Sequence, residues 1–215
     1  MSEAQVAHRL RAAIVMDYQN IHLTAHDNFE AFGTPKHHSL IHPLAYARNV
    51  IDERNRRQRS GYPHADLVKM EVYRGQPVEE HEPKRYAYTQ QELSRWTRDD
   101  RIDVIYRPLK YTIDRNSGVI RGIQEKGVDV LCALAVIRAV MNSNIDLVIL
   151  ATHDSDLDPC LEEAVQIGGT GTRVETTGWA SSQIRTRQAP NVHGRKLWRT
   201  FLDEEAYRRC LDPDR

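Results

Sequence analysis

The sequence predicts an α/β protein, in which a mostly parallel sheet is covered by helices on both faces as a three-layer α/β/α sandwich. Short apolar runs, typical of buried strands, alternate along the chain with longer segments of helical periodicity. The clearest strand is 145–151, and the most apolar helix candidate, 128–141, precedes it. In a chain of 215 residues with 40% hydrophobic residues, this alternation indicates one domain with its own core.

The first half of the chain supplies two predicted strands and a predicted helix. Residues 12–16 form a short apolar run that ends in Asp17, as expected of a buried strand. The polar segment 22–42 holds five of the ten histidines and is predicted to be a loop. Apolar spacing predicts a helix over 43–59, and alternation predicts the second strand over 67–73.

The second half continues the alternation and adds a hairpin. Residues 111–120 predict a β-hairpin, because an Asn-Ser-Gly turn separates β-branched residues. The other predicted elements are helices at 84–101, 128–141 and 157–167 and strands at 102–106, 145–151 and 172–176. We expect an N-terminal extension at 1–11, the folded domain at 12–190, and a C-terminal basic segment with a short helix at 191–215.

The charge composition excludes a uniformly basic nucleic-acid coat but not opposed patches, since 30 basic and 30 acidic residues give zero net charge. Of the basic residues 24 are arginine, which suits bidentate phosphate contact and equally fits a compositional bias of the genome. No apolar run approaches the ~20 residues of a membrane span, and no signal peptide is evident. Three cysteines without a C-x-x-C pair favour a reducing compartment, so we expect a cytoplasmic protein.

Carboxylates follow the predicted strands at the points where each strand ends. Asp17 ends the first strand with Asn20 three residues later, Asp154 and Asp156 follow strand 145–151, and Asp129 opens the apolar helix. Because ligands of parallel sheets bind beyond the carboxyl ends of the strands, these acids are expected to meet at one edge. Their mutual repulsion requires a cation, and Mg²⁺ and Mn²⁺ prefer carboxylate oxygens.

Each acid also has a purely structural interpretation. Asp158 before Pro159 fits a helix N-cap with proline at the first helical position, and Asp156 can cap the same helix. Asp129 also suits the positive end of its helix dipole, and Asp17 suits a turn. Three segments that end in acids at one edge favour the metal site over these separate explanations.

Other kinds of site find little support. No glycine-rich phosphate loop and no serine nucleophile elbow is present, and Asp17-Tyr18-Gln19 lacks the second acid of a D-x-D phosphatase. His153 adjoins the predicted site but is as consistent with a surface or supporting role. The histidines of segment 22–42 lack cysteine or glutamate partners at zinc spacing, which favours a solvated loop.

Three motifs occur in order: Asp17-Tyr18-Gln19-Asn20, Lys126-Gly127-Val128-Asp129 and His153-Asp154-Ser155-Asp156-Leu157. They match the D-x-x-N, K-G-V-D and S-G-D-S-D-F patterns of the NYN domain family, which the chain resembles over about residues 12 to 190. The sequence departs from the family with His153 in place of glycine and Leu157 in place of phenylalanine. A further acid of many relatives is missing from the stretch 188–191.

The resemblance implies a PIN-like nuclease fold and an endoribonuclease that depends on Mg²⁺ or Mn²⁺ and leaves a 5′-phosphate. It implies an acidic metal-binding and catalytic cluster of Asp17, Asp129, Asp154 and Asp156. Supporting roles fall to Asn20, Lys126, Ser155 and His153. Some family members bind RNA or act as regulators, so the alternative is a catalytically degenerate RNA-binding or regulatory module.

The predicted RNA surface lies toward the C-terminus. Residues 183–199 include Arg185, Arg187, Arg195, Lys196 and Arg199 without any acid, and Trp179 and Trp198 flank them. Arginines beside aromatic residues suit single-stranded or looped RNA, although a solvated tail is the competing interpretation. A second basic patch at 54–59 has the same two interpretations. We expect no membrane partner, and a homodimer is compatible with the sequence.

Overall fold

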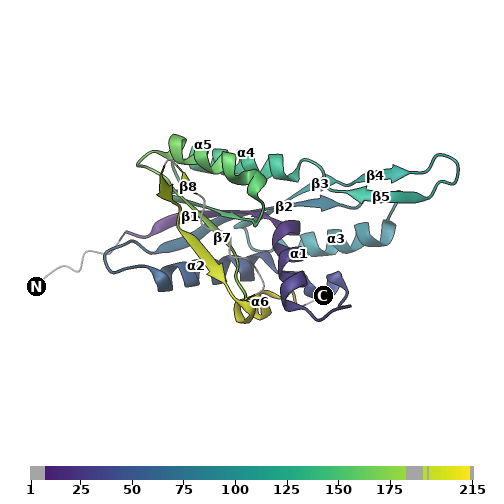
Figure 1. The fold of residues 1–215 in the computed structure, drawn as a ribbon, viewed down its shortest axis with the longest axis horizontal. Coiled ribbons are helices and arrows are strands. Elements are labelled where there is room, and N and C mark those ends of the chain that lie inside the picture. The colour runs from purple at the N-terminus through teal and green to yellow at the C-terminus, as the bar shows by residue number, and fades with distance from the viewer. Residues whose placement is uncertain (1–7, 183–190, 193, 214–215) are drawn as a thin grey trace, which may run out of the picture.

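A computed structural model describes residues 8–182, 191–192 and 194–213, and its centre is a six-stranded, fully parallel sheet. The strand order is β10-β7-β6-β1-β2-β3 (Figure 1). The strands are β1 (Leu10–Asp17), β2 (Ala65–Gln76), β3 (Ile102–Pro108), β6 (Leu147–Ala151), β7 (Arg173–Trp179) and β10 (Arg199–Leu202). The predicted parallel sheet is therefore confirmed.

Helices cover both faces of this sheet, which completes the predicted α/β/α sandwich. One face is packed by helices α1 (Tyr18–Phe29), α2 (Pro43–Arg57), α3 (Pro83–Trp96) and α6 (Glu204–Cys210). The other is packed by α4 (Val128–Val140) and α5 (Asp158–Gly168), which run side by side in Figure 1. Two 3₁₀ turns, η1 (Lys36–Ser39) and η2 (Ser155–Leu157), precede α2 and α5.

The central strand β1 shows why its sequence is continuously apolar. Ile14 and Met16 are buried in the core under α1 and α2, whereas Ala13 and Val15 face the core under α4 and α5. Successive side chains of a strand point to opposite faces, so a strand covered on both faces needs apolar residues at every position. Burying each Ile or Val contributes about 1.5–3 kcal/mol, and this fixes the strand that carries Asp17.

The loop predicted at 22–42 is wrong in its first part, because α1 extends to Phe29. Ile21, Ala25 and Phe29 recur every four residues and are all buried against the sheet. His22 is also buried, and its Nε2 lies 2.9 Å from the Ser39 hydroxyl. Burial lowers the pKa of His22 to about 4, so this histidine is a neutral core residue rather than a solvated one.

Two of the expected RNA-binding features are structural. Arg54 of the 54–59 patch is fully buried in α2, and its guanidinium donates two hydrogen bonds of 2.8 Å to Glu175 on β7. Arg57 pairs with Glu53 on the same helix. Trp179 is also fully buried, and its indole N–H donates to the carbonyl of Ile21. Neither Arg54 nor Trp179 is therefore available to pair or stack with RNA.

Two segments outside the main helices and strands complete the fold. The predicted hairpin is confirmed as β4 (Lys110–Ile113) and β5 (Ile120–Gln124), which project beyond the six-stranded sheet in Figure 1. The C-terminal part contains the short strands β8 (Asn191–Val192) and β9 (Arg195–Lys196) before the unpredicted edge strand β10. The short helix expected in this region is α6.

No helix in the described part of the chain has the length and apolarity to cross a bilayer. The three cysteines, Cys132, Cys160 and Cys210, are all free.

Candidate active site

Asp17 lies at the carboxyl end of β1, where the strand passes directly into α1. It is the N-cap of α1, and its Oδ1 accepts the backbone N–H of Asn20 at 3.2 Å. This cap satisfies one of the free N–H groups of the first helical turn. Only 8% of Asp17 is exposed, so the carboxyl is held at the edge of the sheet with little access to water.

The loop after β6 brings a second acid to the same edge. The Asn20 side-chain oxygen accepts the backbone N–H of His153 at 2.7 Å, which joins the start of α1 to this loop. Asp154 is the N-cap of η2, and its Oδ1 accepts the N–H of Asp156 at 2.9 Å. Because β1 and β6 are neighbours, the D-x-x-N motif and the aspartate-rich motif are held together.

His153 supports this loop through its ring. Its Nε2 accepts the backbone N–H of Trp179, at the end of β7, at 2.9 Å. Gly178 makes room for the ring, since a Cβ there would lie 2.8 Å from His153 Nε2. The imidazole that stands in place of the family's glycine therefore ties the ends of β6 and β7 together.

Asp129 reaches the edge from the first turn of α4. Gly127 precedes the helix with a φ of +74°, a left-handed conformation that favours glycine. The Nε of Arg107 donates to the carbonyl of Lys126 at 2.6 Å and so fixes this turn to the end of β3. Asp129 and Lys126 are both exposed.

Glu125 is a fourth acid of the site that the sequence did not identify. It follows β5, and its carboxylate accepts the backbone N–H of Gly75 near the end of β2. A Cβ at Gly75 would lie 2.7 Å from Glu125 Oε1, so the glycine allows the close approach. Its position beside the K-G-V-D motif was a usable clue. The strand before it is in the hairpin, however, so the strand-end argument did not apply.

The four acids, which we call the acid group (Asp17, Glu125, Asp129 and Asp154), interact electrostatically. Burial is the largest cause of a rise in the pKa of Asp17 to about 7, and the charges of Glu125, Asp154 and Asp129 raise it further. Burial and the charge of Asp129 also raise the pKa of Glu125. Within the described residues, none of the four forms an ion pair. Like charges without a cation at a half-buried edge are costly, as expected of a binding site for a cation.

The donor chemistry of the acid group fits a hard divalent cation, because Mg²⁺ and Mn²⁺ bind carboxylate oxygens. The side chains do not yet converge as ligands: among the described residues, no three histidine, cysteine, aspartate or glutamate side chains lie together closely enough to hold a metal ion. Binding would therefore require the carboxylates to turn toward one another.

The remaining predicted residues are less central. Asp156 and Ser155 are exposed on η2. Asp158 is not the expected N-cap of α5, because the helix begins at Asp158 itself and Leu157 occupies the cap position. Lys196 is exposed on β9, and the backbone of Arg195 lies on the same strand. Arg185 and Arg187 lie outside the described residues.

Comparison with known proteins agrees with the motifs. The family model of the NYN domain matches residues 11–192. No curated protein matches the sequence. Among solved structures, a protein of unknown function from Vibrio parahaemolyticus is similar at 18% sequence identity and a TM-score of 0.43. The match covers 81% of this chain and 84% of that one.

Proposed function

Because this chain belongs to the NYN domain family, whose members are generally nucleases, we propose that it is a metal-dependent endoribonuclease that hydrolyses RNA phosphodiester bonds. The observation that carries the proposal is the acid group. Three separate segments and the end of the hairpin bring unpaired carboxylates to the carboxyl edge of a parallel sheet. This edge is where α/β folds bind their ligands.

In this proposal, Asp17, Asp129, Asp154 and Glu125 hold Mg²⁺ or Mn²⁺, with Asp156 on the exposed rim. A bound divalent ion lowers the pKa of a water molecule and offsets charge on the phosphoryl oxygens. Asp17, whose pKa burial raises to about 7, would have to be ionised to hold the cation. Asn20 holds the loop that carries Asp154 in place through its hydrogen bond to His153. The serine and histidine side chains of the site are not needed as nucleophiles.

The free cysteines support a reducing environment. Burial raises the pKa of Cys160 to about 11 and that of Cys210 to about 12, so both thiols stay protonated and resist oxidation at neutral pH. We therefore propose a cytoplasmic enzyme. Independently of the cysteines, the basic sequence around Lys196 and Trp198 leads us to propose single-stranded or looped RNA as its substrate.

Cleavage of a mixed RNA pool tests the proposal directly. Wild type should cut with Mn²⁺ or Mg²⁺ and stop cutting in chelator. The Asp154→Asn variant should lose cleavage while it keeps the wild-type circular dichroism spectrum. Asp100→Asn is the matched control, because Asp100 is exposed just before β3, at the opposite edge of the sheet. An Asp154→Asn protein that cuts at the wild-type rate would refute the site assignment.

The second candidate is a catalytically degenerate module that binds RNA or regulates. The specific observation in its favour is that no three potential ligands among the described residues lie at metal-binding positions. RNA binding that is insensitive to divalent ions, together with no cleavage of any RNA in the pool, would identify this module.

A further inference from the structure

The β4–β5 hairpin is an arm that starts at the acid group and ends in solvent. The chain enters it from β3 through a single residue, Leu109, and leaves it directly into Glu125, four residues before Asp129. The turn between the strands, residues 115–119, is exposed throughout, and Figure 1 shows the arm projecting past the end of the main sheet. A ligand at the acid group therefore has the arm beside it.

The root of the arm is anchored. The Tyr111 hydroxyl donates to Glu82 Oε2 at 2.6 Å and accepts the backbone N–H of Val78 at 3.1 Å. The Tyr111 ring also contacts the ring of His81. These contacts tie β4 to the connection between β2 and α3, so the arm has a defined direction relative to the sheet.

The arm carries several exposed cations that have no ion-pair partner among the described residues. Residues 107–126 contain five basic and two acidic residues in a chain whose total charge is zero. Arg121 pairs with Asp114. The other four cations are exposed and form no ion pair with any described residue: Arg107, Lys110, Arg115 and Lys126.

The two faces of the arm differ in chemistry. Cross-strand partners share a face, so Lys110 and Gln124 lie on the same side as Thr112 and Gly122. This face carries the cation of Lys110 and the neutral side chains of Thr112 and Gln124. The opposite face carries Tyr111 and the apolar partners Ile113, Ile120 and Ile123. A polar, cationic and acid-free face is suited to a phosphate backbone.

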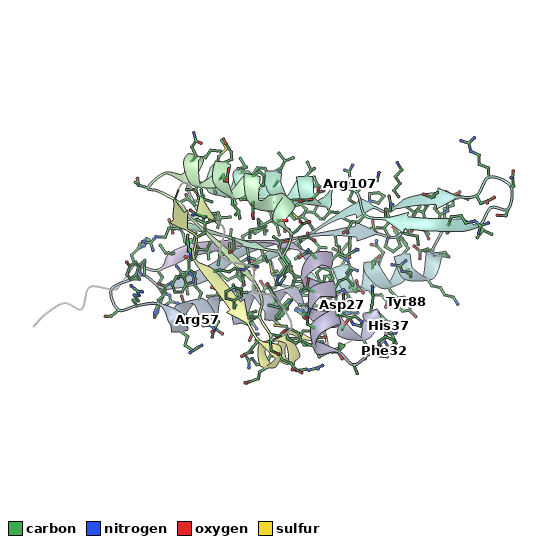
Figure 2. The ribbon with its side chains drawn as sticks, viewed as in Figure 1. Asp27, Phe32, His37, Arg57, Tyr88 and Arg107 are labelled. Atoms are coloured by element: carbon green, nitrogen blue, oxygen red, sulfur yellow. The ribbon has the colours of Figure 1, made fainter. Side chains whose placement is uncertain are left out.

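Arg107 connects the arm to the acid group. Its Nε is held by the carbonyl of Lys126, and a Cβ at Gly127 would lie only 3.1 Å from that Nε. Figure 2 shows Arg107 at the end of α4 nearest the hairpin. Its guanidinium keeps further donors exposed, and arginine binds phosphate oxygens through such paired donors.

We infer that the β4–β5 arm binds the phosphate backbone of the RNA strand that enters the acid group. This inference rests on the proposed function and names the surface that holds its substrate. β4 spans about 13 Å at about 3.3 Å per residue, long enough to follow more than one phosphate. A second copy of the chain is disfavoured as the occupant, because pairing two arms would bring unpaired cations together.

RNA affinity in chelator tests the arm independently of cleavage. We would compare the Kd for a single-stranded RNA between wild type and Lys110→Gln/Lys126→Gln. The control is Arg98→Gln/Arg173→Gln, which removes two exposed charges at the amino edge of the sheet. The arm variant should bind about tenfold more weakly, and the slope of log K against log salt should fall by about 1.4. The control should bind as wild type does.

The RNA-affinity results test the arm independently of the nuclease activity. Equal affinities of the arm variant and wild type, equal losses in both variants, or no RNA binding by wild type would overturn the inference, even if cleavage occurs. An arm-dependent Kd without any metal-dependent cleavage would support the arm and refute the nuclease. A change of oligomeric state in the arm variant, with RNA affinity unchanged, would show that the arm binds protein instead.

Discussion

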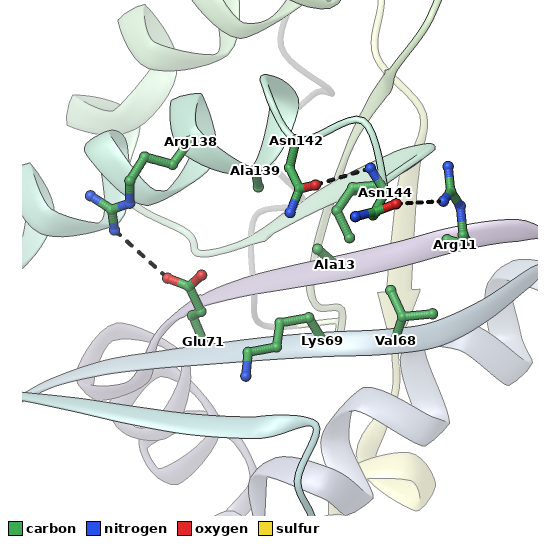
Figure 3. Close-up of a pocket in the computed structure, with 10 residues that line it drawn as sticks. Arg11, Ala13, Val68, Lys69, Glu71, Arg138, Ala139, Asn142 and Asn144 are labelled. Atoms are coloured by element: carbon green, nitrogen blue, oxygen red, sulfur yellow. Dashed lines mark hydrogen bonds and ion pairs between the residues drawn. The ribbon is translucent and has the colours of Figure 1, made fainter.

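The two edges of the sheet differ in whether their charged side chains form ion pairs. Toward the amino ends of the strands, a hollow of about 510 Å³ is lined by Arg11, Lys69, Glu71 and Arg138 (Figure 3). Every one of these charges has a partner: Arg11 binds Asp146, Lys69 binds Asp103, and Arg138 faces Glu71. At the carboxyl edge, the acid group has no ion pair with any described residue.

This difference separates structural charge from functional charge. The amino-edge hollow has room for a ligand, but its charges are already neutralised and leave little field for a charged ligand. At the carboxyl edge the charges are uncompensated, and the carboxylates of Glu125, Asp154 and Asp129 raise the pKa of Asp17. A site for a cation is indicated better by uncompensated charge than by volume.

The largest expected effect comes from breaking a paired charge. Arg54→Met removes the cation of a fully buried pair and leaves Glu175 alone in the core. The free energy of unfolding should fall by about 3–5 kcal/mol, measured by urea denaturation. Adding Glu175→Leu should recover most of the loss. A loss of less than about 1 kcal/mol would show that the ion pair with Arg54 is not what stabilises the buried Glu175.

The next effect has the opposite sign and concerns an unpaired charge. The pKa of Asp17 in the folded protein, about 7, exceeds the ordinary value of 3.8, so the native state binds the proton more tightly than the unfolded chain. In chelator, the contribution of Asp17 to the free energy of unfolding should therefore be largest below pH 3.8. It should decrease as the pH rises to 7, by at most about 4 kcal/mol.

Asp17→Asn tests this relation because the amide oxygen can still accept the Asn20 N–H. At pH 8 in chelator, the variant should be more stable than wild type by about 2–4 kcal/mol, and at pH 4 the two should be alike. Unfolding by urea at both pH values measures the difference. A variant that is destabilised equally at both would show that the carboxyl is not under electrostatic strain.

Glu125→Gln tests the acid that the sequence did not identify. The amide keeps an oxygen for the Gly75 N–H but removes the charge from the acid group. We expect metal-dependent cleavage to fall by about 10- to 100-fold, as for residues at or next to a metal ligand. Glu79→Gln, an exposed change in the connection before α3, is the control. Unchanged cleavage would remove Glu125 from the site.

The smallest effect is expected at the amino edge. Arg138 is 59% exposed and lies 3.8 Å from Glu71, so the pair is solvent-screened. Arg138→Gln should change the free energy of unfolding by no more than about 1 kcal/mol and leave cleavage unchanged. A large loss of cleavage from this substitution would mean that the hollow takes part in function and that the contrast between the edges is false.

Much of the fold followed from periodicity, and the failures have physical reasons. The strands around 12–16 and 145–151 were predictable because burial on both faces makes a strand continuously apolar. α1 was missed because His22 occupies a core position through its bond to Ser39, which depends on tertiary structure. Trp179 looked like a stacking residue, but the fold places it inside.

The site was predictable only where an acid ended a strand of the main sheet. Asp17 and Asp154 met that rule, since their strands are neighbours. Glu125 follows a hairpin strand, and its hydrogen bond with Gly75 on β2 holds it beside the acid group. The pairing state of each arginine was equally hidden, since Arg54 and Glu175 are 121 residues apart.

The position of β10 has a consequence for synthesis. β1 is made first and lies in the middle of the sheet, yet the edge beyond β7 is closed only by residues 199–202. All four acids are present once residue 154 has been made, but β7 keeps an unpaired edge until β10 follows. A nascent chain paused between these points would expose that edge to other strands, so this is the interval in which misassembly is most favoured.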